Sequence, residues 1–318
     1  MARHKSMVPG TPRQKIISGF IFICLILVLI FYFGLFQKTQ NIIVYGATNN
    51  QIDLSVVSGI AMADREESAI KSGAVRAVII PHHLIDAKSV ALGIKDLSLS
   101  SPQKIIIISP DHFAKCPKLM CTTKGIFQTF FGDVIINNES VEYLEKFSDI
   151  VVDSNLFSEE HGIYGIVPFI KHYVPKAEII PIVISQKGMG DQITRSRMIS
   201  VLNNILSDKN VSLVISSDFS HYLPLAAAEQ EDILTQNSFC SGNSQEILNL
   251  KNPAQSDCPL CLWLLEQEAK KLDFWYPNLI NHNNSADLLK DYSTKETTSH
   301  FTFSFSDSAT STNCLIIK

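Results

Sequence analysis

Apolar runs alternate with amphipathic segments along most of the chain. Runs rich in Ile and Val predict buried strands at 74–81, 104–110, 177–185 and 211–216. Apolar residues at helical spacing predict helices at 55–72, 89–97, 140–147, 162–173, 194–206, 226–235 and 260–272. The strict alternation of FTFSFS at 301–306 predicts a strand with one wet face. The order of these elements predicts an α/β fold, in which a mostly parallel or mixed sheet is sandwiched by helices.

The N-terminal part of the chain has a different pattern. Residues 16–36 carry no charge, and about 20 apolar residues suffice for a helix to cross a bilayer. We therefore expect one transmembrane helix at 16–36, preceded by a tail at 1–15 and followed by a linker at 37–54 and a domain at 55–318. A cleavable signal peptide is the alternative, but the apolar run is long for one and no small-residue cleavage site follows it.

The charges and cysteines around this segment bear on localisation. Four basic residues precede the segment and only Lys38 follows closely, so the positive-inside rule predicts a cytoplasmic N-terminus and an extracytoplasmic domain. Cys24 lies within the predicted span. The other six cysteines lie where disulfides can persist, which allows disulfides without requiring them: they are Cys116, Cys121, Cys240, Cys258, Cys261 and Cys314.

Composition limits the class of partner. Of the 318 residues, 46% are hydrophobic and 18% charged, and the formal net charge is −4. Without a long basic run in the domain, this balance argues against nucleic acid as a partner.

Histidines and acids recur where the predicted strands end. His82 and His83 follow the strand at 74–81, and His112 follows the strand at 104–110. Asp218 and His221 follow the strand at 211–216. For any one of these residues taken alone, a turn or a helix cap is the better explanation, and the stretch after 216 would by itself be a helix start. Three strand ends with a histidine instead favour ligands or catalytic groups at one sheet edge.

Two further clusters precede predicted helices. In SEEHG, Glu159 and Glu160 come directly before His161, where carboxylates commonly cap a helix. In SDCPLC, Cys258 and Cys261 flank a helix start, where a thiol has a lowered pKa and acts as a nucleophile or metal ligand. The alternative is a pair of small buried residues.

The ordered set of these motifs resembles the Memo family, whose bacterial members are called AmmeMemoRadiSam system protein B. The resemblance spans about 75–306 and rests on these segments: IPHH, IIIISPDHF, FQTFFGDVII, EEHGIYGIVPFIKHYVPKAEIIPIVIS, VISSDFSHYLP, DCPLCLWLLE and NHNNSADLLKD. It implies a fold similar to LigB-type extradiol dioxygenases and a redox-active iron or copper site formed by two His and one Cys. It also implies partner proteins of the AmmeMemoRadiSam system.

Carried over by position, the family's metal ligands fall on His82, His112 and Cys258. The same resemblance places Asp218, His221 and His161 on catalytic positions.

The chain also departs from the family's pattern. His83-Leu84 replaces Ala-Gly, Asp111 replaces a Ser, and Pro259 replaces a Gly. A Glu that the pattern has a few residues after His161 is absent.

Three functions remain open from the sequence. The first is a membrane-anchored Memo-like protein with a mononuclear metal site and a redox or oxygen-linked activity on an unknown small molecule. A facial set of two imidazoles and an anion leaves positions open on iron, whereas a thiolate ligand favours copper(I), zinc or a redox-tuned iron. The second is a non-catalytic metal-binding or interaction protein that retains the fold. The third is a dithiol redox protein that uses Cys258 and Cys261.

Overall fold

The computed structural model of the chain describes residues 43–44, 50–68, 74–185, 191–308 and 314. The predicted tail at 1–15 and the predicted membrane helix at 16–36 lie outside the described residues. Across the described ranges, no helix has the length and apolarity needed to cross a bilayer. The membrane helix therefore stays a prediction.

Four parallel strands form the middle of a mixed nine-stranded sheet. Their order is β2 (Val75–Ile80), β9 (Val211–Ser216), β3 (Lys104–Pro110) and β8 (Glu178–Ile184). These are the four strands that the apolar runs predict, so the predicted α/β class is confirmed.

Antiparallel pairs extend the sheet on both sides. Beyond β8 comes β4 (Met120–Thr122), antiparallel to β8, and then β7 (Ile150–Val152), parallel to β4. Beyond β2 comes β12 (Thr297–Ser306), antiparallel to β2, which also pairs with β10 (Phe219–Leu223) and β11 (Pro277–Asn284). The last of the described strands is therefore an inner strand of the sheet.

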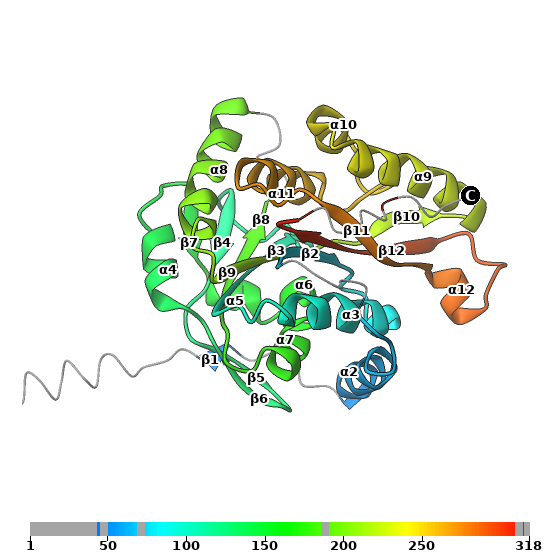
Figure 1. Cartoon of the computed structure of the whole chain (residues 1–318), viewed down its shortest axis with the longest axis horizontal. Helices are drawn as coiled ribbons and strands as arrows, with labels where there is room; N and C mark the ends of the chain where they lie inside the picture. The colour runs from blue at the N-terminus through cyan, green and yellow to red at the C-terminus, as the bar shows by residue number, and fades with distance from the viewer. Residues whose placement is uncertain (1–42, 45–49, 69–73, 186–190, 309–313, 315–318) are drawn as a thin grey trace, which may run out of the picture. The chain divides into compact units, whose positions relative to one another are not determined.

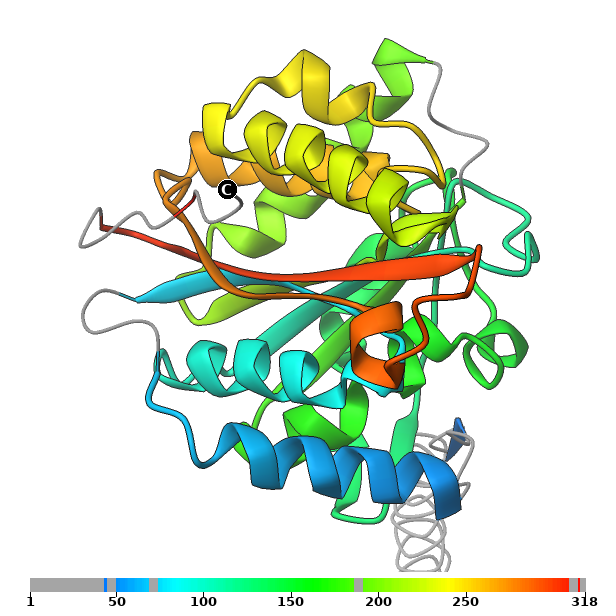
Figure 2. The same cartoon turned by 90° about the vertical axis from the view of Figure 1, so that its right-hand side faces the viewer.

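Helices cover both faces of this sheet (Figures 1 and 2). One face is covered by α8 (Gln192–Leu206), α9 (Leu225–Ser241), α10 (Ser244–Leu248) and α11 (Pro259–Lys271), and the other by α2 (Asn50–Ala63), α3 (Ala87–Ser98), α6 (His161–Tyr164) and α7 (Val167–Tyr173). The shorter helical elements are η1 (Leu84–Asp86), α4 (Asn138–Leu144), α5 (Ser154–Phe157) and α12 (Ser285–Leu289). A separate three-stranded sheet consists of β1 (Ile43–Val44), β5 (Ile126–Thr129) and β6 (Gly132–Ile135).

The two helix layers produce two hydrophobic cores, one on each side of the sheet. Along β3, Ile105 and Ile107 pack into the core with α3 and α7, and Ile106 and Ile108 into the core with α8 and α11. All four side chains are fully buried, which contributes roughly 1.5–3 kcal/mol each. Successive strand residues point to opposite faces, so this double burial explains the unbroken Ile run.

Four details differ from the sequence predictions. The helix predicted at 55–72 is α2, which begins at Asn50, inside the predicted linker, and ends at Ala63. The single helix predicted at 162–173 is two helices, α6 and α7, and Pro168 lies in the first turn of α7, where its missing N–H is tolerated. The interpretation of the stretch after Ser216 as a helix start is wrong, because β10 comes first and α9 begins at Leu225.

The predicted wet face of the strand at 301–306 is also wrong. β12 is buried on both faces, because its polar side chains pack against α3. The hydroxyl of Thr302 donates to the carbonyl oxygen of Ser89 in α3 at 3.2 Å.

All six cysteines that follow the predicted membrane segment form disulfides. The pairs are Cys116–Cys121, Cys240–Cys314 and Cys258–Cys261. The second of these pairs ties the C-terminal end of the chain to α9.

Candidate metal centre

The carboxyl ends of three parallel strands bring histidines and an aspartate to one edge of the sheet. His82 and His83 follow β2, Asp218 follows β9 and His112 follows β3. β9 lies between β2 and β3, so Asp218 leaves the sheet between the two strands that carry histidines. In open α/β sheets this edge is where ligands bind.

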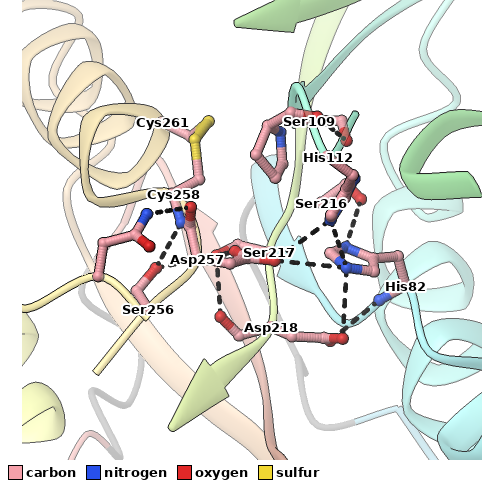
Figure 3. Close-up of a disulfide and its surroundings, with 12 residues drawn as sticks. His82, Ser109, His112, Ser216, Ser217, Asp218, Ser256, Asp257, Cys258 and Cys261 are labelled. Atoms are coloured by element: carbon pink, nitrogen blue, oxygen red, sulfur yellow. Dashed lines mark hydrogen bonds and ion pairs between the residues drawn. A yellow bond between two sulfur atoms is a disulfide. The ribbon is translucent and has the colours of Figure 1, made fainter. Parts of the chain in front are cut away.

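Three donor atoms converge at this edge (Figure 3). The Nε2 atoms of His82 and His112 are 3.1 Å apart. Oδ2 of Asp257 lies 3.3 Å from Nε2 of His82 and 3.6 Å from Nε2 of His112. Ligands held about 2.1 Å from a metal at angles of about 90–120° are roughly 3.0–3.6 Å apart. The donor types and their spacing therefore fit a metal ion bound by two imidazoles and one carboxylate.

The other ring nitrogen of each histidine faces a polar partner. Nδ1 of His82 lies 3.2 Å from the hydroxyl oxygen of Ser216, and Nδ1 of His112 lies 2.5 Å from Oε1 of Glu160. Metal-binding histidines usually donate their second N–H to such a partner, which fixes the tautomer and the ring orientation. With Nδ1 protonated and Nε2 deprotonated, each ring would direct its lone pair toward the shared point.

Glu160 holds the His112 side of the site in place. Its carboxylate is fully buried and also accepts from the backbone N–H groups of His112 at 3.2 Å and Gly162 at 3.1 Å. It is therefore the cap of α6 that the sequence predicts and, in addition, a partner of His112. A Cβ at Gly162 would lie 2.1 Å from the hydroxyl oxygen of Ser109, so only glycine permits α6 to approach the end of β3 this closely.

Asp257 is held by the neighbouring strand end. Its Oδ1 accepts from the hydroxyl of Ser217 at 2.7 Å, and its backbone N–H donates to the carbonyl oxygen of Asp218 at 3.1 Å. These contacts leave Oδ2 directed toward His82 and His112. The sequence does not reveal Asp257 as a ligand, because the family resemblance places the third ligand on the adjacent Cys258 and Asp257 follows no predicted strand.

The structure does not place a thiolate at the site. The sulfur of Cys258 is bonded to Cys261, and both residues are buried at the start of α11 (Figure 3). The two predicted histidine ligands, His82 and His112, do lie together, with Asp257 as their neighbour. Coordination by Cys258 stays a prediction that requires the disulfide to be reduced.

Asp218 lies between His82, which belongs to the three-donor centre, and His83, which does not. Its Oδ1 accepts from the backbone N–H of His82 at 3.1 Å, and its Oδ2 lies 2.8 Å from Nδ1 of His83 and 3.3 Å from Nε2 of His82. Burial alone would raise the pKa of Asp218, but the adjacent His82 and His83 outweigh it and hold the pKa well below its usual range. Asp218 is therefore a buried carboxylate anion between two imidazoles.

The remaining predicted residues lie at different distances from the donors. The ring centroid of His161 is 4.2 Å from that of His112 and 5.1 Å from that of His82. The buried His221 lies farther out, with its ring centroid 5.9 Å from that of His83. His161 is thus part of the histidine cluster, and His221 borders it. The catalytic roles of both residues stay predictions.

The histidines of the cluster differ in protonation. Burial lowers the pKa of His82 to about 3. Burial, assisted by the charge on His112, lowers the pKa of His161 to about 4. Burial also opposes a charge on His112, but its contacts with Asp257 and Glu160 outweigh it and raise the pKa to about 10. At neutral pH, His82 and His161 are therefore neutral and His112 holds the proton that a metal would displace.

Asp111, which departs from the family's pattern, has a structural role. Its carboxylate accepts from the backbone N–H groups of Lys115 at 3.0 Å and Cys116 at 2.8 Å. It therefore closes the loop after β3, next to the Cys116–Cys121 disulfide, and does not contact the three donors.

Comparison with known proteins shows which family the chain is similar to. The family model described as Memo-like protein matches residues 49–299. A MEMO1 family protein of Methanococcus maripaludis strain C6 is 27% identical over 229 residues, which are 68% of this chain and 79% of that protein. A MEMO1 family protein of Aquifex aeolicus is 23% identical over 227 residues, 69% of this chain and 82% of that protein.

A solved structure is also similar in part. The crystal structure of the uncharacterized protein JW3007 from Escherichia coli K12 aligns with a TM-score of 0.42 and 14% identity, over 71% of this chain and 99% of that one. This similarity is too low to support an argument. The match to the family model covers most of the chain, with the histidine-bearing strand ends inside it, and the chain belongs to the Memo family.

Proposed function

We propose that this chain binds one redox-active metal ion, iron or copper, through His82, His112 and Asp257, and uses it in a redox or oxygen-linked reaction of a small molecule. The observation that carries the proposal is the convergence of two Nε2 atoms and one carboxylate oxygen within 3.1–3.6 Å of one another. With two imidazoles and one carboxylate as ligands, a bound iron ion would keep positions open for dioxygen and substrate.

The chain's own groups would orient the ligands and move protons. Glu160 and Ser216 fix the two ligand rings through Nδ1. His161 is neutral, lies beside both rings and has a side chain that is 29% exposed, so it is placed to take a proton from a bound substrate. Asp218 and His221 would act on the His83 side, with Asp218 as the fixed anion and His221 as a proton carrier.

Two other functions remain as alternatives. A non-catalytic metal-binding or interaction protein is favoured by the departures from the family's pattern, such as the structural role of Asp111. A dithiol redox protein would use Cys258 and Cys261, which are paired at a helix start. Exposed fractions of 3% and 0% for these two residues leave little access for an exchange partner, and this function ranks third.

We also propose that the domain is extracytoplasmic and anchored by the helix predicted at 16–36. The pairing of all six cysteines that follow this segment favours an oxidising compartment. The protein should stay in the membrane fraction after carbonate washing, and protease added to spheroplasts should cut the domain. A soluble mature form beginning near Gln40 would instead indicate a signal peptide. Proteins of the AmmeMemoRadiSam system are the proposed partners.

Metal analysis of the purified full-length protein tests the proposed centre. Stoichiometric iron or copper that is lost in His82→Ala and His112→Ala supports it, and His172→Ala, which changes an exposed histidine outside the cluster, is the matched control. Zinc at full occupancy, or no metal, would favour the non-catalytic alternative.

A further inference from the structure

A second group of metal-ligating side chains lies beside the first, on three adjacent strands. His83 follows β2, Asp218 follows β9 and His300 belongs to β12. One ligand atom from each of these residues lies within 4.8 Å of the other two. Nδ1 of His83 is already 2.8 Å from Oδ2 of Asp218. Two ligands of one metal ion are roughly 3.0 Å apart in adjacent positions and roughly 4.2 Å apart in opposite positions. Small rotations of the side chains would therefore bring all three ligand atoms to metal-binding positions.

His300 is the member that points to a ligand. Its side chain is fully buried, and within the described part of the chain neither of its ring nitrogens has a hydrogen-bond partner. Oδ2 of Asp86, 3.7 Å from Nδ1, is beyond hydrogen-bond distance and already accepts from Ser89 at 2.6 Å and Asn283 at 3.0 Å. Burying an imidazole with both nitrogens unsatisfied is unfavourable, and a bound ion is one cause of such an arrangement.

We propose that His83, Asp218 and His300 bind a second divalent first-row transition metal ion, and that Asp218 is shared with the first centre. Two imidazoles and a carboxylate are suitable donors for zinc, iron(II) or cobalt(II). Oδ2 of Asp218 lies 3.3 Å from Nε2 of His82, a ligand of the first centre. Paired metal ions in proteins are about 3.5–4 Å apart, a spacing that one carboxylate can bridge. The inference extends the proposed function to a dinuclear centre but rests on different ligands.

The second site has an opening to solvent. The side chain of His83 is 42% exposed, whereas those of Asp218 and His300 are fully buried. Asp218 and His300 would therefore bind the ion from the protein interior, and His83 would bind it from the solvent side. A substrate could reach this ion past His83 without entering the core.

Cobalt(II) titration of the metal-stripped full-length protein tests the proposal. The expected result is two equivalents bound by the wild-type protein and one by His300→Leu and by His83→Ala, with the lost site at least tenfold weaker. His282→Gln is the matched control, because His282 lies on the neighbouring strand β11 and is paired with Asp232 at 2.9 Å. It should bind two equivalents.

The pattern of losses separates this inference from the proposed function. One equivalent in the wild type, lost in His112→Ala and kept in His300→Leu, refutes the second site and leaves the first. One equivalent lost in His300→Leu and His83→Ala, but kept in His112→Ala, supports the second site and refutes the first. If a buried water satisfies His300 instead, His300→Leu and His83→Ala would bind as many equivalents as the wild type, and the inference would be wrong.

Folding of the variants is checked by thermal melting without metal. His300→Leu removes unsatisfied polar atoms from a buried position, so its melting temperature should not fall below that of the metal-free wild type. Added cobalt(II) should raise the melting temperature of the wild type more than that of the variant. An equal rise in both proteins would also refute the second site.

Discussion

Two residues next to each other before α11, Asp257 and Cys258, are the candidates for the third metal ligand. Substituting each of them separately shows which one binds the metal. The structure directs Asp257 Oδ2 toward His82 and His112, whereas Cys258 is bonded to Cys261. We expect Asp257→Asn to lose metal and Cys258→Ser to keep it. Asn occupies the same volume as Asp, and its oxygen can still accept from Ser217, so the loss would reflect the missing charge and donor.

The magnitude follows from the number of donors. Binding free energies of roughly 10–16 kcal/mol are typical of four-ligand zinc sites, so each ligand contributes about 2.5–4 kcal/mol. Losing Asp257 should therefore weaken binding by about 10²–10³-fold, since each 1.4 kcal/mol is a factor of ten. Competition with a chromogenic chelator measures a change of this size in the purified full-length protein.

The opposite result would refute this reasoning. If Cys258→Ser loses the metal and Asp257→Asn retains it, the thiolate is the ligand and the disulfide with Cys261 is not the metal-binding state. Reductant provides the control for this case. Wild-type affinity should be the same before and after reduction if Asp257 is the ligand, and should rise on reduction if Cys258 is.

Three further substitutions test other parts of the structure. Gly162→Ala places a Cβ against the hydroxyl oxygen of Ser109 and should lower the free energy of unfolding by about 1–3 kcal/mol. Denaturant titration measures this change, and an unchanged midpoint would contradict the close approach of α6 to β3. Glu160→Gln removes the anion beside His112 and should weaken metal binding about 10–100-fold, by the same chelator assay. Burial raises the pKa of Glu268 to about 6, so the wild type should lose about 1 kcal/mol of stability as the pH rises from 4.5 to 7, because the folded state holds this proton more tightly than the unfolded state. Glu268→Gln should remove that part of the pH dependence, and identical profiles would refute the assignment.

The sequence was sufficient to predict the helix and sheet layers and two of the three ligands of the proposed centre. Runs such as 104–110 identify buried parallel strands by composition alone, and parallel strands end at a common edge, so His82 and His112 could be placed together. The strand at 301–306 was identified by its alternation. The burial of its polar face could not be predicted from the sequence, because α3 covers that face of β12 and no local pattern records such a tertiary contact.

The rest of the site depends on contacts between distant segments. Asp257 follows no strand and reaches the histidines only because Ser217 and the backbone of Asp218 hold its loop. Glu160 looks like an ordinary helix cap, and its contact with His112 bridges 48 positions of the sequence. His300 lies within an alternating strand, where nothing distinguishes it from its polar neighbours. A motif search finds residues that end strands and misses residues that only the folded chain brings there.

The inner position of β12 affects how the protein must be made. Of the described strands, Thr297–Ser306 is the last to leave the ribosome, yet it pairs with three strands that precede it, β2, β10 and β11. Until it arrives, β2 presents an unpaired edge, and such edges associate with other chains. If the domain crosses a membrane during synthesis, it must be kept from folding or aggregating until β12 has been exported. Nascent chains that stop short of Thr297 are therefore substrates for chaperones and proteases, and His300 cannot reach His83 before that last strand is in place.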